Sequence, residues 1–223
     1  MLELDAGRFF QLHMTARGRG EGSGERTERA PNVVELRPHA RQDFTSSLGM
    51  IVFLASWGMM FATLFFAYAF LRARSVTWPP PGVHPLPIAL PAVNTAVLLV
   101  SSWTFMRGVA ALARGERSQL PRWVAATFAL GAVFLALQFV VWRSVAAAGL
   151  HHTTGLYGGI FYAFTVFHAL HVVAGLLVLL WVFVRALMGR YSEHNVVNVR
   201  VCAMFWHFVD AVWVLMFVSI FLI

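Results

Sequence analysis

Residues 164–181 read FTVFHALHVVAGLLVLLW, a stretch that is apolar on every side of a helix. Helices on the surface of soluble proteins carry a polar face, whereas a helix that is apolar all round lies in a membrane or a large core. Two histidines, His168 and His171, lie three positions apart near its middle. The stretch therefore predicts a membrane-spanning helix that carries two imidazoles at membrane depth.

The composition of the whole chain agrees with this prediction. Of 223 residues, 59% are hydrophobic and 12% are charged, whereas about a quarter of the residues in soluble domains are charged. The net charge is +7, but its distribution favours a membrane surface over nucleic acid. The single cysteine, Cys202, excludes an internal disulfide and a thiolate metal cage.

Apolar segments of membrane-spanning length recur on both sides of the opening stretch. A span needs about 20 apolar residues, and five segments reach that length: 48–71, 88–113, 123–147, 156–187 and 199–223. The fourth is longer than a span requires, so it should tilt or protrude. Since an open strand edge would leave backbone groups unpaired in lipid, each must be helical. The predicted fold is an all-α membrane protein, a five-transmembrane-helix bundle.

The connections and the N-terminal region complete the domain organisation. WPPPGVHPLP at 78–87 and RGERSQLPR at 114–122 hold the turn formers that end helices. Residues 1–47 are rich in Arg, Glu and Gly, without the apolar periodicity that builds a core. We expect a solvated cytoplasmic tail, with docking on a partner as the alternative, followed by a membrane domain over 48–223. The tail does not resemble a secretory signal, since the first apolar run is too long and too late.

The arginines predict the orientation. With the tail inside the cell, fourteen of the seventeen basic residues fall on the cytoplasmic side, and Arg72, Arg74 and Arg143 fall outside. The short loops alone divide seven against three. The excess of positive charge on cytoplasmic loops therefore predicts a cytoplasmic N-terminus and an external C-terminus.

Four polar residues at membrane depth are the candidate functional residues. Asp210 is the one acidic residue well inside a predicted span, and His207 precedes it by three positions, on the same helical face. His168 and His171 form a matching pair on the preceding span. Because the two spans are consecutive and antiparallel, the pairs should lie at similar depth.

Three interpretations of these residues compete. The four side chains can converge on a metal ion, or they can pass protons, since an ionisable residue in a membrane is a functional candidate by default. Only Asn94, Thr95 and Gln138 offer further stepping stones for protons, and they lie on other helices. The third interpretation, an interhelical hydrogen-bond network that fixes helix register and leaves donors for lipid headgroups or a partner, is the one we favour.

Small residues favour close helix packing. GLYGGIFYAF at 155–164 opens the fourth span with three glycines, and Gly131, Ala132 and Ala136 are candidates for the same role on the third span. The eight tryptophans recur near span ends, where they anchor helices, or on helix faces, where they pack. The sequence contains no phosphate-binding loop, nucleophile elbow or Cys-His zinc pattern, and no pair of broken helices typical of a carrier.

Several motifs resemble subunit III of the haem–copper oxidases. FHALHVVAG at 167–175 is similar to the family's FHGxHVxxG, and FWHFVDAVWVLMF at 205–217 is similar to its YWHFVDxVWLFLF, the most specific signature. WPPPG at 78–82, NTAVLLVSS at 94–102, FLALQ at 134–138 and AAGLHHTTGLYGG at 147–159 follow in the family's order. The resemblance covers about 48–223, which includes all five predicted spans.

The resemblance implies an accessory subunit without a catalytic centre of its own. It would pack beside subunit I, which holds the haems and copper, contact other oxidase subunits and bind phospholipid between its helices. It would support assembly and sustained turnover in a bacterial inner membrane, within a complex that reduces oxygen and pumps protons. Larger members have seven spans, so the missing pair is absent here or supplied by subunit I. The residues expected in the polar, lipid-associated network are His168, His171, His207, Asp210 and Trp206.

The sequence departs from the family's motifs at three positions, and two alternative functions are open. The family's acidic residues in three helices are replaced here by Trp57, Val141 and Arg200, so a role that depends on those carboxylates is in doubt. One alternative is a subunit III-like partner of a nitric oxide reductase. The other is a stand-alone membrane metalloprotein that binds its metal through His168, His171, His207 and Asp210.

Overall fold

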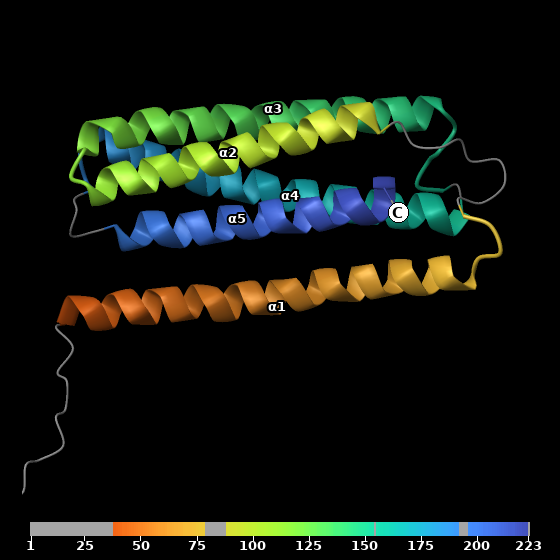
Figure 1. The fold of residues 1–223 in the computed structure, drawn as a ribbon, viewed down its shortest axis with the longest axis horizontal. Helices are drawn as coiled ribbons and strands as arrows, with labels where there is room; N and C mark the ends of the chain where they lie inside the picture. Colours follow the sequence, from red (N-terminus) through yellow and green to blue (C-terminus); the bar gives the residue numbers. More distant parts are fainter. Residues whose placement is uncertain (1–37, 79–87, 154, 192–195, 223) are drawn as a thin grey trace, which may run out of the picture. The chain divides into compact units, whose positions relative to one another are not determined.

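Five long helices make up the part of the chain that the computed structural model describes, residues 38–78, 88–153, 155–191 and 196–222. The helices are α1 (Pro38–Arg74), α2 (Ala89–Ala113), α3 (Leu120–Ala147), α4 (Gly155–Leu187) and α5 (Val197–Phe217) (Figure 1). A short 3-10 turn, η1 (Arg117–Gln119), precedes α3, and a π-helical turn, η3 (Val218–Leu222), follows α5. All five are long and apolar enough to cross a membrane, and the described ranges hold no strand. The predicted all-α, five-span fold is confirmed.

Two helix lengths differ from the apolar segments. The helix α1 begins at Pro38, well before the first apolar segment at 48, because a helix can continue into water once lipid has fixed its apolar part. The helix α4 has 33 residues, or about 50 Å at 1.5 Å per residue, against about 30 Å for the hydrocarbon layer. It therefore extends beyond the hydrocarbon layer or tilts within it. Residues 1–37 and most of the connection at 78–87 lie outside the described ranges.

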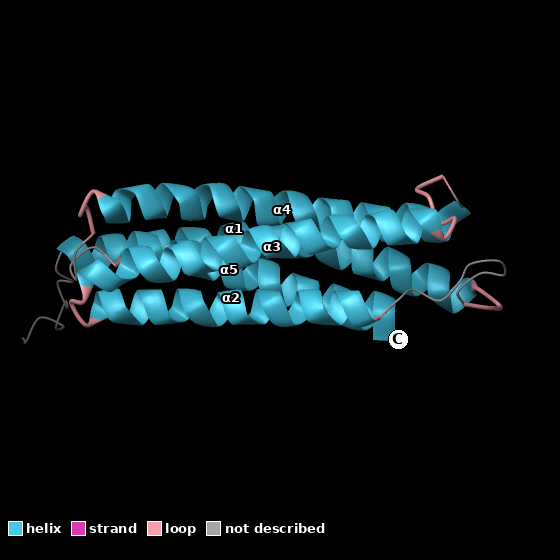
Figure 2. Ribbon diagram, turned by 90° about the horizontal axis from the view of Figure 1, so that it is seen from above, coloured by secondary structure: helices cyan, strands magenta, loops and turns pink. Residues whose placement is uncertain are grey.

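The helix α5 holds the bundle together. It contacts α1, α2 and α4, while α3 contacts α2 and α4. Figure 2 shows α5 between α2 on one side and α1 and α4 on the other. The helix α1 begins at the end of the bundle where α5 begins, and the described end of the chain lies at the opposite end (Figure 1). Because the number of spans is odd, the start of the first helix and the described end of the chain lie at opposite ends of the bundle. The last long helix, α5, is the central one.

Trp206 on α5 occupies the middle of the core and is 1% exposed. Gly131 on α3 and Gly175 on α4 flank its indole ring, because a Cβ atom at Gly131 would lie 2.7 Å from Trp206 Cη2, and one at Gly175 would lie 2.9 Å from Cε3. Glycine thus lets two helix backbones approach one large ring, as expected for small residues in membrane bundles.

The other small residues play different parts. Ala132 and Ala136 are exposed, so the expectation that they pack against a neighbouring helix is wrong within this chain. Gly158 is buried against the backbone carbonyl of His151, in the loop before α4 rather than on another helix. A glycine-rich stretch predicts close approach of backbone but does not say which backbone approaches.

Charged residues gather at the end of the bundle where α2 joins α3. There Gly115 has a φ of 82°, a left-handed conformation that glycine adopts readily, and the Arg114 Nε to Glu116 Oε1 distance is 2.8 Å. This hydrogen bond lowers the pKa of Glu116 and raises that of Arg114. The stabilisation it gives is present at neutral pH and is lost as the pH falls through the lowered pKa of Glu116.

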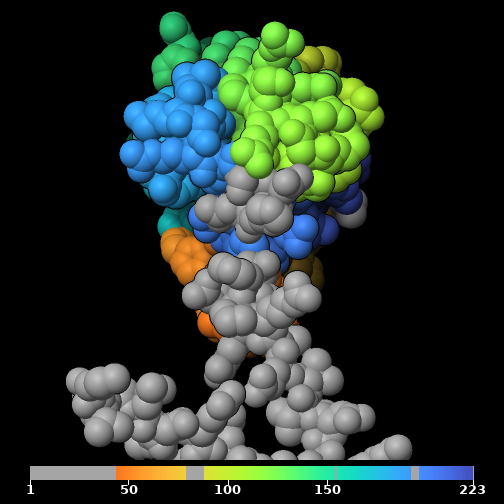
Figure 3. Space-filling model, turned by 90° about the vertical axis from the view of Figure 1, so that its left-hand side faces the viewer, coloured from red at the N-terminus to blue at the C-terminus, as the bar shows by residue number. Residues whose placement is uncertain are grey.

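Aromatic rings accompany arginines at the same end. The Arg107 guanidinium lies 5.3 Å from the Trp103 ring and 5.9 Å from the Trp123 ring, and that of Arg185 lies 4.6 Å from Trp181. Figure 3 shows this end, with the α2–α3 connection in green beside the end of α4 in blue. Tryptophan and arginine together are typical of the membrane–water interface.

Candidate functional site

Three polar side chains at membrane depth join α2 to α5. The Ser102 hydroxyl donates to Asp210 Oδ2, and the Ser102 Oγ to His207 Nδ1 distance is 2.6 Å. Because a hydroxyl has one proton, Ser102 accepts from the Nδ1–H of His207 while it donates to the carboxylate. Asp210 is 4% exposed, and its second oxygen, Oδ1, is buried without a partner in the described residues. These three residues are the α2–α5 polar seam.

Trp206 adds a second bond between the same helices. Its Nε1–H donates to Ser101 Oγ over 3.1 Å, and the Ser101 hydroxyl donates to the Leu98 carbonyl over 2.7 Å. Sequence reasoning missed Ser101 and Ser102, although both belong to the quoted motif NTAVLLVSS. Two consecutive serines inside an apolar segment were the available signal, since serine makes hydrogen bonds across helices in membranes.

His168 lies in a different part of the core from the α2–α5 polar seam. Its ring is 5.2 Å from Trp213 of α5 and 5.9 Å from Phe134 of α3, centroid to centroid. The side chain is 0% exposed, and neither ring nitrogen has a hydrogen-bond partner among the described residues. Its surroundings are therefore aromatic rather than ionic.

His171 faces α1. Its Nδ1–H donates to the Phe167 carbonyl of its own helix over 2.6 Å, and its ring lies 4.6 Å from Trp57 and 5.2 Å from Phe61. The remaining nitrogen, Nε2, is buried without a partner in the described residues. The structure thus brings His207 and Asp210 together, and it places His168 and His171 in two further environments.

The stand-alone metalloprotein would need these four side chains around one ion. Among the described residues, no group of three or more His, Cys, Asp or Glu side chains is placed to share a metal. The ligand set His168, His171, His207 and Asp210 does not converge, because His168 packs on Trp213 whereas His207 bonds to Ser102. The histidine pair of α4 and the His207–Asp210 pair of α5 were expected at similar depth, but their side chains do not face one another.

Further polar pairs cross the core about two helical turns along α2 from the α2–α5 polar seam, both on the same side of it. Asn94 Nδ2 donates to Gln138 Oε1 over 3.2 Å between α2 and α3. The Trp213 Nε1–H donates to Thr95 Oγ1 over 2.9 Å between α5 and α2. Such bonds fix helix register, because their alternative in hydrocarbon is an unpaired polar group.

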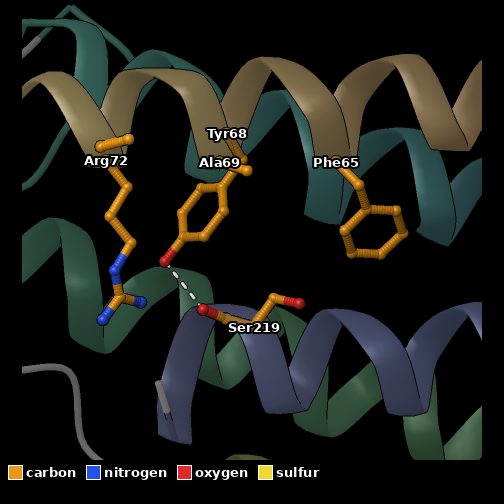
Figure 4. Close-up of a pocket in the computed structure, with 6 residues that line it drawn as sticks. Phe65, Tyr68, Ala69, Arg72 and Ser219 are labelled. Atoms are coloured by element: carbon orange, nitrogen blue, oxygen red, sulfur yellow. Dashed lines mark hydrogen bonds between the residues drawn. The ribbon is translucent and has the colours of Figure 1, made fainter.

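Two grooves open on the surface of the bundle. One, of about 410 Å³, lies between α1, α4 and α5, and is lined by residues that include Phe53, Ala174, Trp181 and Asn198. The other, of about 500 Å³, lies between the far end of α1 and the end of the chain. Figure 4 shows Tyr68 and Arg72 of α1 extending there toward Ser219, whose carbonyl accepts a hydrogen bond of 2.7 Å from the Tyr68 hydroxyl.

Three residues differ from the family's sequence motifs, and each lies in a different environment. Trp57 fills the space beside His171 with an edge-on ring contact. Val141 is 0% exposed, so a carboxylate at this position would need a buried partner. Arg200 is exposed near the start of α5. Val141 therefore lies in the core, whereas Trp57 is half-buried beside His171.

One titratable group outside the membrane-spanning helices is also buried. Tyr191, in the α4–α5 connection, is 4% exposed, and burial raises the pKa of its hydroxyl. That hydroxyl has no hydrogen-bond partner among the described residues. The side chain therefore acts as a packing residue of the connection.

These features define a class of protein: a multi-pass helical membrane protein whose buried polar residues join its helices to one another. The family model for cytochrome c oxidase subunit III matches residues 40–223. Cytochrome c oxidase subunit 3 of Synechocystis sp. is 37% identical over 176 residues, which are 78% of this chain and 74% of the relative. The protein of the same name from Thermostichus vulcanus is 34% identical over 186 residues, covering 83% and 90%.

A third relative extends the comparison to another bacterial group. The probable cytochrome c oxidase subunit 3 of Mycobacterium tuberculosis is 38% identical over 178 residues, covering 79% of this chain and 87% of the relative. The chain belongs to the cytochrome c oxidase subunit III family. The resemblance seen in the sequence motifs is thereby confirmed.

Proposed function

We propose that this chain is the accessory, non-redox subunit III of a respiratory haem–copper oxidase that reduces oxygen and pumps protons. The observation that carries the proposal is the family match over 40–223, which includes all five described helices except the first two residues of α1. The relatives described above are all named cytochrome c oxidase subunit 3, which favours this complex over the nitric oxide reductase partner. Haems and copper are assigned to partner subunits, and this chain carries no catalytic centre of its own.

The polar residues support a role in assembly. His207, Asp210 and Ser102 bond to one another across α2 and α5, and Trp206 bonds to Ser101 across the same interface. Their hydrogen-bonding groups are used to hold helices, which suits a subunit that stabilises a complex. The expected partners are subunit I as the main contact and the other oxidase subunits.

Membrane placement follows from the charged ends. The interface pairs of Arg107 with Trp103 and of Arg185 with Trp181 lie at the end that we assign to the cytoplasm. The proposed location is a bacterial inner membrane, with the N-terminus inside the cell and the C-terminus outside.

The groove between α1, α4 and α5 is the proposed phospholipid site. Its volume of about 410 Å³ is in the range of small-molecule sites, which run from about 300 to 1,000 Å³. Its lining is mainly apolar, including Phe53, Ala174 and Phe205, which suits an acyl chain. Trp181 lies on its lining with the Arg185 guanidinium over its ring, which supplies a cation for a lipid phosphate in the proposed site.

Filling this groove tests the accessory function. The Ala174→Phe variant of the intact oxidase should retain less phospholipid after detergent extraction and should lose activity sooner during turnover. The haem spectrum should stay unchanged, because the electron carriers belong to other subunits. The measurements are phosphorus per haem, the time course of oxygen consumption and the visible spectrum.

The matched control for Ala174→Phe is a change at the preceding residue of α4, Val173. Val173 is 41% exposed and does not line the groove, so Val173→Phe adds a ring to the outer face of α4 instead. It should leave lipid content and the time course as in the wild type. Equal phospholipid content and an equal time course of oxygen consumption in Ala174→Phe and Val173→Phe would show that the groove has no part in the proposed function.

A further inference from the structure

Buried polar atoms without partners gather at one level of the bundle, on three helices. Asn94 Oδ1 on α2, Gln138 Nε2 on α3 and both ring nitrogens of His168 on α4 have no hydrogen-bond partner among the described residues. The three side chains are 0%, 1% and 0% exposed. Most buried polar groups in native proteins are hydrogen-bonded, to protein or to ordered water.

Ring contacts place the three side chains near one another. Asn94 and Gln138 are bonded directly, over 3.2 Å. Phe134 lies one turn before Gln138 on α3, and its ring centroid is 5.9 Å from that of His168. Trp213 bonds to Thr95, the neighbour of Asn94, and its ring lies 5.2 Å from His168. Phe134 and Trp213 therefore link His168 to the level of the bundle at which the amide pair lies.

The unpaired atoms are chemically complementary. Asn94 Oδ1 is an acceptor and the Gln138 Nε2 group is a donor, while a neutral imidazole has one donor and one acceptor. A rotation of the two amides can close a second bond between Asn94 and Gln138, but it supplies no partner to His168. Each unpaired buried group costs free energy, and water is a group of the right chemistry, since it has two donors and two acceptors.

We propose that Asn94, Gln138 and His168 hold an ordered water molecule that bridges the amide pair to one ring nitrogen of His168. The two ring nitrogens point away from each other, so one water reaches one of them. The site is internal to this chain and separate from the α2–α5 polar seam, in which Ser102 pairs with His207 Nδ1 and Asp210 Oδ2. Its role is to connect α2 and α3 to α4, since the hydrogen bond between Asn94 and Gln138 joins α2 and α3 alone.

A double-mutant cycle on the intact oxidase tests this site. His168→Phe and Gln138→Met replace the polar side chains by apolar ones of similar shape, and the loss of this chain from the complex is followed on heating in mild detergent. If one water joins the two side chains, each single change lowers the temperature of half-loss, and the double variant falls by clearly less than the sum of the two. Additive shifts, or a rise for His168→Phe, would overturn the proposal, because an unpaired imidazole in a dry core is improved by an apolar ring.

The control pair and a direct measurement keep the test decisive. His171→Phe with Gln138→Met should be additive, because His171 faces α1 and bonds to the Phe167 carbonyl. Water-edited magnetisation transfer to ¹⁵N-labelled histidine rings should reach the resonance that disappears in His168→Phe. Absence of that transfer in a folded, assembled complex would contradict a bound water even if the cycle showed coupling.

Discussion

Replacing Gly175 with alanine is expected to lower the free energy of unfolding by about 1–3 kcal/mol, the usual cost of overpacking a core. The new Cβ would lie 2.9 Å from Trp206 Cε3 and 3.3 Å from a ring atom of Phe205. Trp206 cannot retreat, since on its other side the Gly131 position is equally close, at 2.7 Å. The chain should leave the complex at lower temperature in mild detergent, and less of it should accumulate in the membrane.

Gly159→Ala is the matched control on the same helix. A Cβ there would meet only the His152 carbonyl oxygen, at 3.7 Å, an ordinary contact, and alanine favours a helix over glycine by up to about 1 kcal/mol. This variant should be as stable as the wild type or more stable. If Gly175→Ala behaved like Gly159→Ala, Trp206 would not be clamped between α3 and α4 as described.

Replacing Ser102 with alanine should also destabilise the bundle, by about 1–3 kcal/mol for each polar group left without a partner. The change removes one oxygen atom yet unpairs two groups, His207 Nδ1 and Asp210 Oδ2. Asp210→Asn should cost less, because an amide oxygen can still accept from Ser102. On heating, the chain should dissociate at a lower temperature than the wild type in both variants, and at the lowest temperature in Ser102→Ala. Haem reduction should be unchanged in complexes that stay assembled.

Ser56→Ala provides the reference for Ser102→Ala. Ser56 is exposed on α1 and bonds only to the Val52 carbonyl of its own helix, over 3.0 Å. Its replacement should leave the dissociation temperature unchanged. Loss of haem reduction in a fully assembled Asp210→Asn complex would count against the structural role of the α2–α5 polar seam.

The helices could be predicted from the sequence because lipid leaves few choices. An apolar run of about 20 residues must become a helix to pair its backbone groups, so hydropathy alone located all five. The start of α1 could not be located in this way, since residues 38–47 lie outside the apolar run and are not constrained by lipid.

The side-chain partners were less predictable. The spacing of residues within a helix shows which of them share a face, but it does not reveal which neighbouring helix that face contacts. The i, i+3 spacing correctly put His207 and Asp210 on one face, but their common partner is Ser102 of α2, not the histidines of α4. Gly131 was correctly expected to let another helix approach, whereas the ring that fills the space, Trp206, could not be inferred. Both outcomes depend on how α2, α3, α4 and α5 are arranged, which no local pattern specifies.

The claim that this chain is an accessory subunit of a haem–copper oxidase is tested most directly by what it carries with it. The chain is tagged at its C-terminus, membranes are extracted in mild detergent, and the visible spectrum and metal content of the purified material are recorded. We expect haem absorption and copper together with larger protein bands. A lone band at the 24.9 kDa of this chain with one equivalent of tightly bound metal would contradict that claim.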